Sequence, residues 1–165
     1  MLRKVQSGKK PGQAGKSFAI VASQYNAKYV DAMLRAAVSE LKRARAKKIQ
    51  VIRVPGAFEI PAVASAVAQT NQSHAPRTTN QVDAIICLGV IFQGQTSHAQ
   101  HIGWGVTHAL AQIQVQHAIP VIHGVFVFEN EEHARVRCLG RDHNRGREAA
   151  LTALHMAGVM GTLKR

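Results

Sequence analysis

The stretch Val82–Leu88, VDAIICL, decides the fold class, because every residue in it except Asp83 is apolar. Side chains of a β-strand alternate between the two faces of its sheet, so such a run predicts a strand that is covered on both sides. Three more stretches have strand composition, namely Ser17–Ser23, Ile49–Val54 and Pro120–Phe128. A helical pattern follows each strand, and this alternation predicts an α/β fold with a parallel sheet.

The helical segments are defined by their apolar spacing. Apolar residues recur three or four positions apart through Val30–Leu41 and Ile102–Ile113, which is typical of a helix with one buried face. Glu59–Gln69 is rich in alanine and carries Pro61 where a first helical turn tolerates it. The remaining segments are helices over Glu131–Cys138 and about Gly146–Met160, a polar loop over Thr70–Gln81 and a loop over Gly89–Ser97.

Length and composition restrict the class of protein. A chain of 165 residues with 46% hydrophobic and 18% charged residues has room for one ordinary folded domain. We expect a mobile basic tail over residues 1–16, for which a targeting peptide is the alternative, and a single domain over residues 17–165. No apolar run approaches a membrane span and no secretory signal is visible, so we expect a cytoplasmic protein. Two cysteines, Cys87 and Cys138, exclude a disulfide scaffold and a four-cysteine zinc site.

Charge is distributed unevenly along the chain. Lys and Arg number 21 against nine Asp and Glu, which gives a formal net charge of +12. The basic cluster Lys42–Lys48 ends the first helical segment, where it is either a solvated helix terminus or a nucleic-acid contact. Residues Ala84–Phe128 contain five histidines and none of the four charged residue types. Trp104, Ala111 and Val115 add apolar area outside the buried helix face, so this stretch predicts self-association.

Common catalytic motifs are missing from the sequence. It contains no GxGxxG after a strand, no Walker loop and no GxSxG, and the pair Gly103 and Gly105 falls inside a predicted helix. His98 and His101 are three residues apart, but no third ligand stands at a supporting spacing, so we expect no metal site.

The loop after the Val82–Leu88 strand carries the most chemistry. Ligands of parallel sheets bind at the carboxyl ends of the strands, where this loop lies. It offers glycines, the hydroxyls of Thr96 and Ser97, and then His98 at the start of a helix. This arrangement suits a phosphate beside an acid–base group, and a helix N-cap with an incidental histidine is the alternative reading.

Five strings along the chain resemble the successive motifs of the lumazine synthase family. They are FAIVASQYN (18–26), IRVPGAFEIP (52–61), LGVIFQGQTSH (88–98), PVIHGV (120–125) and NRGREAALTALHMA (144–157). The resemblance implies a flavodoxin-like three-layer α/β/α sandwich with a four-stranded parallel sheet. It also implies condensation of 5-amino-6-ribitylaminouracil with 3,4-dihydroxy-2-butanone 4-phosphate, in the penultimate step of riboflavin biosynthesis, without a cofactor.

The resemblance implies a role for individual residues. His98 is the expected acid–base catalyst, since a histidine exchanges protons near neutral pH. Tyr25, Ala57, Phe58, Glu59, Val90, Ile91, Phe92 and His123 correspond to the pyrimidine side of the site, and Gln95, Thr96, Ser97 and Arg137 correspond to the phosphate side. Glu59 is equally suited to be a first-turn helix acid, and Val90–Phe92 to plain packing. Asn26, which can also cap a helix, and Arg145, which replaces a family lysine and also suits a surface role, are further candidates.

Four departures from the family pattern concern rate and pH dependence. Gln93 stands where the family has arginine, Gln100 where it has an acid, and His123 where it has phenylalanine, while the 70–81 loop is longer than usual.

The family forms pentamers, some of them packed as sixty-subunit capsids, and the short segment Cys138–Asn144 resembles that of capsid formers. Riboflavin synthase is a further expected partner. The alternative function is a non-catalytic flavin- or nucleic-acid-binding protein on the same scaffold.

Overall fold

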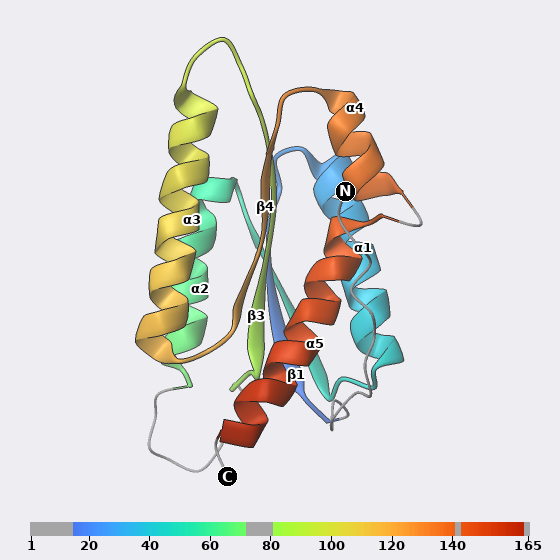
Figure 1. Ribbon diagram of the computed structural model, residues 1–165, viewed down its shortest axis with the longest axis vertical. Coiled ribbons are helices and arrows are strands. Elements are labelled where there is room, and N and C mark those ends of the chain that lie inside the picture. The colour runs from blue at the N-terminus through green and yellow to red at the C-terminus, as the bar shows by residue number, and fades with distance from the viewer. Residues whose placement is uncertain (1–14, 72–80, 141–142, 164–165) are drawn as a thin grey trace.

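The computed structural model describes residues 15–71, 81–140 and 143–163 (Figure 1). Strands and helices alternate along the chain, as the apolar pattern predicts. The strands are β1 (Ser17–Ser23), β2 (Lys48–Val54), β3 (Ala84–Phe92) and β4 (Val121–Phe128). The helices are α1 (Ala27–Arg43), α2 (Ile60–Gln69), α3 (His98–His117), α4 (Glu131–Ala134) and α5 (Arg145–Leu163), with a 3₁₀ turn over Ala57–Glu59 and a π-helical turn over Arg135–Leu139.

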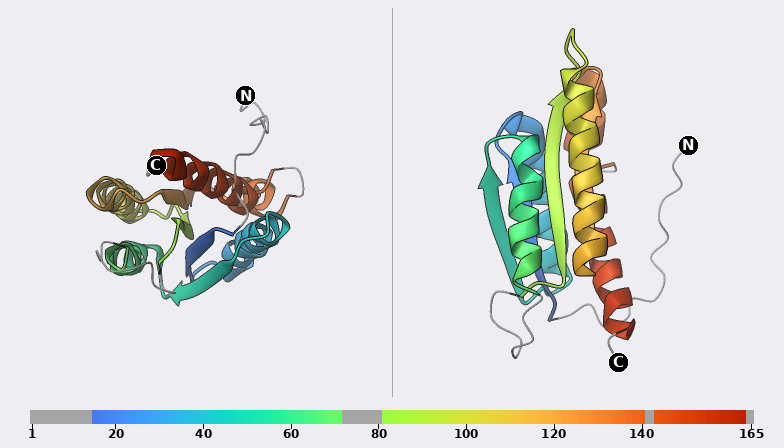
Figure 2. Two further views of the ribbon diagram at one scale, coloured as in Figure 1. Left: turned by 90° about the horizontal axis from the view of Figure 1, so that it is seen from below. Right: turned by 90° about the vertical axis from the view of Figure 1, so that its left-hand side faces the viewer.

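The described strands form one parallel sheet in the order β2-β1-β3-β4. Helices α1 and α5 cover one face and α2 and α3 cover the other, as the end-on view in Figure 2 shows. The α/β class and the three-layer, four-stranded parallel sheet are therefore confirmed. All four strands run in the same direction, so their carboxyl ends meet at one edge of the sheet.

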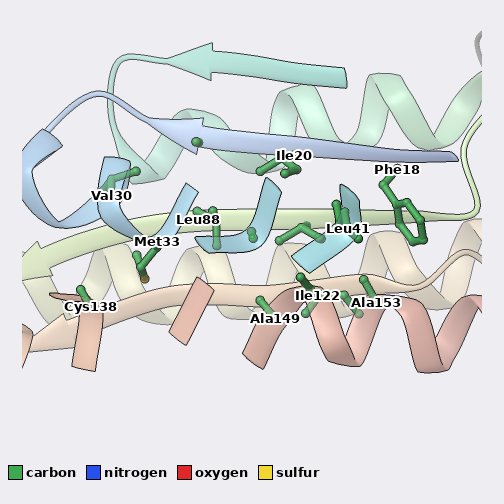
Figure 3. Packing of buried hydrophobic residues seen from close by; sticks show 14 of the residues in the cluster. Phe18, Ile20, Val30, Met33, Leu41, Leu88, Ile122, Cys138, Ala149 and Ala153 are labelled. Carbon is green, nitrogen blue, oxygen red and sulfur yellow. The ribbon is translucent and has the colours of Figure 1, made fainter. Parts of the chain in front are cut away.

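Each face of the sheet has its own apolar core. On the α1 and α5 side, fully buried side chains such as Phe18, Met33 and Leu88 pack together (Figure 3). Small residues of α5 let it approach α1 closely, and a Cβ atom at Gly146 would lie 2.0 Å from the carbonyl oxygen of Met33. On the other side, Ile85 of β3 packs with Val106 of α3. The two cores hold both helical layers rigidly against the sheet.

Several predicted boundaries were wrong. The strand predicted over Val82–Leu88 begins only at Ala84. The expected loop over Gly89–Ser97 begins four residues later, because β3 continues through Phe92 and pairs with β4 as far as Phe128. Gly89 is a packing residue here, since a Cβ atom would lie 3.3 Å from both Ile60 and Val125. The helix expected over Glu131–Cys138 is α4 followed by the wider π-helical turn.

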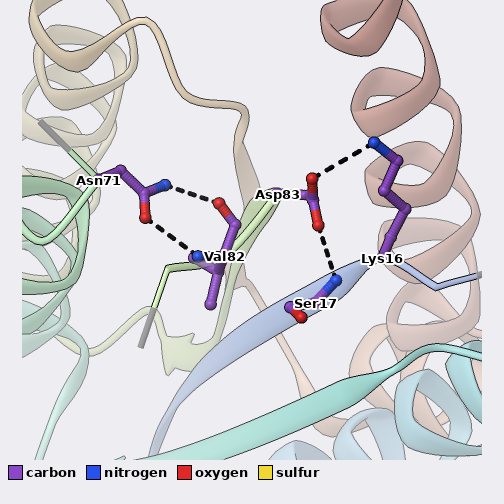
Figure 4. Close-up of polar contacts among 5 residues, drawn as sticks. All are labelled: Lys16, Ser17, Asn71, Val82 and Asp83. Atoms are coloured by element: carbon purple, nitrogen blue, oxygen red, sulfur yellow. Dashed lines mark hydrogen bonds and ion pairs between the residues drawn. The ribbon is translucent and has the colours of Figure 1, made fainter. Parts of the chain in front are cut away.

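Two side chains organise the amino-terminal edge of the sheet (Figure 4). The Asn71 amide donates to the carbonyl of Val82 (2.6 Å) and accepts from its N–H (3.0 Å), which joins the two ends of the 72–80 segment. Asp83 accepts from the N–H of Ser17 (2.7 Å) and from Lys16 (3.4 Å). Most of the expected tail (1–16) and long loop (70–81) lies outside the described residues, so the proposed division into tail and domain stays a prediction.

Both cysteines are buried and neither forms a disulfide. Burial raises the pKa of the Cys87 thiol, and it raises that of Cys138 to about 11. Both thiols are therefore protonated at neutral pH. None of the helices within the described ranges combines the length and hydropathy that crossing a bilayer requires.

Candidate active site

The carboxyl edge of the sheet gathers the loops that carry the predicted site residues. The backbone N–H groups of Gln24 and Tyr25 donate to the carbonyls of Val54 (2.8 Å) and Pro55 (3.0 Å), which joins the loops after β1 and β2. The Gln93 N–H donates to the carbonyl of Phe128 (2.8 Å), which joins the ends of β3 and β4. These backbone bonds hold the loops in a fixed arrangement at one end of the molecule.

Two aromatic rings stand exposed at this edge. Tyr25 is 70% exposed and Phe58 is 60% exposed, which is unusual for side chains of their size. The Tyr25 ring lies over Gly56, where an added Cβ atom would come within 3.1 Å of it. Phe58 lies against α3, since a Cβ atom at Gly105 would be 3.7 Å from its ring. The glycine at position 56 leaves room for the Tyr25 ring. The two exposed rings give this edge an apolar surface open to a ligand.

Asn26 links two loops. Its backbone is left-handed, with φ 57°, and its side chain makes no capping bond to α1. Its amide instead donates to the carbonyl of Val90 at 2.8 Å. Asn26 therefore stands at the N-cap position of α1, but its side chain does not cap the helix, so the side-chain capping alternative is wrong. Its side chain fixes the β1 loop against β3, beside the expected pyrimidine contacts.

Glu59 folds back on its own turn. Its Oε2 accepts a hydrogen bond from the N–H of Gly56 at 2.9 Å. This bond fits the alternative in which Glu59 is a structural acid at the start of a helix. The other oxygen, Oε1, has no partner within the described residues, so one acceptor of this carboxylate stays available.

Gln93 shapes the loop that leads to His98, a role that sequence reasoning missed. Its Nε2 donates to the carbonyls of Gly94 (3.1 Å) and Thr96 (2.9 Å). The loop is thereby closed on itself immediately after β3. No local pattern reveals this role, because an amide in a polar loop has many alternative partners.

His98 is the first residue of the 20-residue helix α3, and its side chain is exposed. Its backbone N–H points to Thr96 Oγ1 at 3.4 Å. One turn later, Nε2 of His101 lies 3.1 Å from Ser97 Oγ. Hydroxyls, an imidazole and the free N–H groups of a helix start therefore lie together, and such a group can hold an anion and exchange protons with it.

The remaining pyrimidine-side residues end β3 and line β4. Val90 is buried, while Ile91 and Phe92 are partly exposed at the strand end. Phe92 packs edge-on against Tyr29, with ring centroids 5.6 Å apart. His123, in the middle of edge strand β4, has its Nε2 at 2.9 Å from Thr107 Oγ1 of α3. Burial lowers the pKa of His123, which favours the neutral imidazole.

The two candidate arginines lie on the other face of the sheet from α3. Arg137 is in the π-helical turn, whose Cys138 packs in the core beneath α1 and α5. Arg145 starts α5, where it donates to Glu148 (2.5 Å) and covers the ring of Phe126 (5.6 Å). Within the described residues, no hydrogen bond or ion pair joins either arginine to the His98 loop. Within one chain, the arginine-bearing segments pack on the α1 and α5 face of the sheet, whereas α3, which begins at His98, packs on the opposite face.

Asn144 holds the arginine-bearing segment in place and was also missed by sequence reasoning. Its side chain is buried, donates to the carbonyl of Cys138 (2.5 Å) and accepts from the N–H groups of Gly146 (2.9 Å) and Arg147 (3.2 Å). An asparagine immediately before a helix is a common cap, so this signal was present in the sequence.

Comparison with known proteins identifies the family. The family model for 6,7-dimethyl-8-ribityllumazine synthase matches residues 15–161. The chain is 38% identical over 148 residues to a 6,7-dimethyl-8-ribityllumazine synthase of Xanthomonas oryzae pv. oryzae, which covers 88% of this chain and 90% of the relative. It is 37% identical over 152 residues to the enzyme of the same name from Xylella fastidiosa, covering 91% and 93%. The expected fold agrees with these matches, and the chain belongs to the 6,7-dimethyl-8-ribityllumazine synthase family.

Proposed function

We propose that the chain catalyses the condensation of 5-amino-6-(D-ribitylamino)uracil with 3,4-dihydroxy-2-butanone 4-phosphate to 6,7-dimethyl-8-ribityllumazine. Family membership supports a transferase of riboflavin biosynthesis. The observation that carries the proposal is His98, which starts α3 beside two hydroxyls at the carboxyl edge of the sheet. A histidine beside an anion-binding helix start suits a reaction that moves protons while phosphate leaves.

His98 is the proposed proton carrier. The amino group of one substrate attacks the ketone of the other, a carbon-bound proton is removed as phosphate leaves, and the second ring closes. Every step moves a proton, and an exposed imidazole at the loop end can accept and return it. Holding two reactants in one orientation supplies much of the rate in such a reaction, so the histidine assists turnover without being the sole source of it.

The phosphate is assigned to the His98 loop and to Arg137. Gln95, Thr96 and Ser97 lie exposed between β3 and α3, where N–H groups and hydroxyls are available to phosphate oxygens. The guanidinium of Arg137 offers a planar pair of donors that suits two of those oxygens. Arg145 is an accessory residue in this scheme, because Glu148 and Phe126 already engage it.

The pyrimidine and its ribityl chain are assigned to the apolar end of the same edge. Tyr25 supplies a ring face for stacking, and the free Oε1 of Glu59 accepts from ligand hydroxyls. Asn26 holds the Tyr25 loop against β3. The other contacts come from the ends of the strands and from the turn after β2, namely Ala57, Phe58, Val90, Ile91, Phe92 and His123.

Subunits are proposed to assemble as pentamers through α3. Trp104, His108, Ala111 and Val115 are exposed and follow one another at spacings of four, three and four, so they share one helix face. Trp104 is 68% exposed and Val115 80%, a large apolar area to leave in water. Assembly would also bring the proposed arginine and histidine of the site together, since Arg137 of one subunit can then meet the His98 loop of its neighbour.

We further propose that the pentamers assemble into a sixty-subunit capsid, that the protein contacts riboflavin synthase, and that it is located in the cytoplasm. Sedimentation velocity over a range of salt concentrations tests the assembly. Pentamers or larger shells are expected at moderate salt, and the basic charge favours free pentamers at low salt. A monomer or dimer at every salt concentration would overturn the shared site, whereas pentamers alone would overturn only the capsid.

The reaction itself is tested by supplying both substrates to the purified protein. Formation of the ribityllumazine is followed by its absorbance and fluorescence, and omission of either substrate is the control. Product formation above the uncatalysed rate supports the proposal. Tight binding of ribitylaminouracil without turnover would instead support a non-catalytic binding protein on this scaffold.

A further inference from the structure

Arg53 lies at the carboxyl end of β2, beside the loop that carries Tyr25. It is the residue before the last of β2, and it pairs in register with Ala22 of β1. Paired residues of neighbouring parallel strands point to the same face of the sheet, and Ala22 packs in the core beneath α1 and α5. The Arg53 side chain therefore lies on the α1 face of the sheet.

The guanidinium of Arg53 contacts both ends of the Tyr25 loop, which consists of residues 24–26. Its Nη2 donates to the carbonyl oxygen of Ser23, the last residue of β1, at 2.9 Å. Its Nη1 donates to Oδ1 of Asp31, the fifth residue of α1, at 2.6 Å. One planar group thus joins the strand that enters the loop to the helix that leaves it.

The Tyr25 ring has little packing of its own. It is 70% exposed, and its neighbour is the backbone at Gly56. Its position therefore depends on the backbone that carries it, which Pro55 holds through the Tyr25 N–H (3.0 Å) and Arg53 holds at both ends. A loop that is fixed before a ligand arrives loses less conformational entropy when the ligand binds.

We propose that Arg53 is a positioning residue for the pyrimidine substrate, and that it acts by holding the Tyr25 loop. The assignment rests on the proposed function, since it requires the Tyr25 ring to stack on ribitylaminouracil. The phosphate of the other substrate is assigned to the His98 loop and Arg137. Within the described residues, no hydrogen bond or ion pair joins Arg53 to either of them. Loss of Arg53 is therefore expected to weaken one substrate and spare the other.

A general contribution to stability is the competing explanation for this ion pair. The side chains of Arg53 and Asp31 are 30% and 40% exposed, and ion pairs with such exposure add little to folding stability. The bond to the Ser23 carbonyl acts instead on the backbone two residues before Tyr25. The two explanations differ in their readout, because positioning changes the affinity for one substrate whereas lost stability affects both.

The test is a double-mutant cycle in the full-length protein. The dissociation constant of ribitylaminouracil and the KM of each substrate are measured for the parent, Arg53→Met, Tyr25→Ala and the double variant. Methionine keeps the apolar stem but donates no hydrogen bond. Arg53→Met should weaken ribitylaminouracil about 10-fold, the cost of one hydrogen bond to a charged group, and leave the KM of the butanone phosphate unchanged. In a protein that already carries Tyr25→Ala, it should cost no further affinity.

Arg43→Met is the matched control. It removes a guanidinium from the other end of α1, where Glu40 keeps Arg147 as a partner. Both substrates should bind to this variant as they bind to the parent. Arg53→Lys keeps the cation without the planar donors, so its affinity for ribitylaminouracil should lie between those of Arg53→Met and the parent. If Arg53→Met does not fold, Arg53→Lys carries the test, and parent affinity in it would then overturn the proposal.

The failure of this proposal is distinguishable from failure of the proposed function. Unchanged binding of ribitylaminouracil in Arg53→Met, equal losses for both substrates, or additive losses in the double variant would overturn the positioning role alone. An equal loss in Arg43→Met would do the same, since any lost guanidinium on this face would then explain the effect. A parent protein that does not bind ribitylaminouracil would overturn the proposed function and the positioning role together.

Discussion

At the scale of single residues, His98 carries the proposed chemistry. His98→Ala should lower kcat by about 10 to 10⁴-fold, because one acid–base group is lost while the rest of the site stays in place. Binding of ribitylaminouracil should persist, since the proposed pyrimidine contacts are elsewhere. His155→Ala is the matched control, since it removes an exposed histidine of α5 that contacts none of the proposed site residues. Steady-state rates that are unchanged in His98→Ala, or equally low in both variants, would remove His98 from the mechanism.

Arg137 is expected to affect one substrate only. Arg137→Ala should raise the KM for the butanone phosphate about 10 to 10²-fold, because a charge-assisted bond to phosphate is lost. The affinity for ribitylaminouracil should be unchanged, since that substrate has no phosphate. Arg135→Ala, two residues earlier in the same turn, removes a guanidinium that is already bound to Glu132 and serves as the control. Equal losses for both substrates would indicate a structural role for Arg137.

His123 links stability to pH. Burial lowers the pKa of His123 in the folded state, so the unfolded chain binds a proton more readily than the folded one. Its contribution to stability is therefore complete above the ordinary histidine pKa and is lost as pH falls through the lower folded value. His123→Gln should remove this dependence while keeping a partner for Thr107. Thermal unfolding of the parent protein and of His123→Gln between about pH 5 and 8 measures this pH dependence. A difference between the two midpoints that stays constant with pH would contradict the role of His123.

Sequence predicted which loops meet at the carboxyl edge of the sheet, but not the hydrogen-bond partners of their side chains. The loops after parallel strands were predictable, because they must meet at the carboxyl edge. The bond from Asn26 to Val90 joins residues 64 positions apart, and no local pattern encodes it. Gln93 was read only as a departure from a family arginine, although its amide closes the loop that leads to His98.

At the scale of elements, sequence predicted the type of each strand and helix better than its ends. β1 was predicted with its observed bounds, because apolar and polar residues change sharply at both ends. The end of β3 was missed because Gly89 suggests a turn when read locally. In the structure that glycine lies in the middle of the sheet, and pairing with Val125 on β4 keeps the strand extended.

The contact between α1 and α5 depends on one glycine. Gly146→Ala should destabilise the fold by about 1–3 kcal/mol, since its Cβ atom would overlap the Met33 carbonyl and push the helices apart. Gly161→Ala, in the same helix, is the control. Its Cβ atom would meet only the end of the Lys16 side chain at 3.4 Å, and alanine favours the helix by up to about 1 kcal/mol. Denaturant unfolding measures the change in the free energy of unfolding of each variant. A Gly146→Ala protein as stable as the parent would contradict the close packing of α1 and α5.

At the scale of the whole molecule, the two edges of the sheet have different surfaces. The carboxyl edge carries the exposed rings, hydroxyls and His98, while the amino edge carries the basic cluster Lys42–Lys48. The uncharged stretch Ala84–Phe128 forms the centre and one edge of the sheet together with α3. Burial explains why β3 and β4 carry no charged residues. It does not explain why the exposed face of α3 carries none. That face and the separated arginines both favour an assembly of subunits.

The central claim is that the chain is a synthase whose sites are completed between neighbouring subunits. Mixing His98→Ala and Arg137→Ala subunits, by joint refolding or co-expression, tests it most directly. Each variant alone has damaged sites, but in an equal mixture roughly one site in four would combine an intact His98 loop with an intact neighbouring Arg137. With the butanone phosphate well below its KM for the parent protein, so that each variant alone is slow, product formation by the mixture should lie well above the mean of the two variants and approach about a quarter of the parent rate. Activity equal to that mean would contradict it.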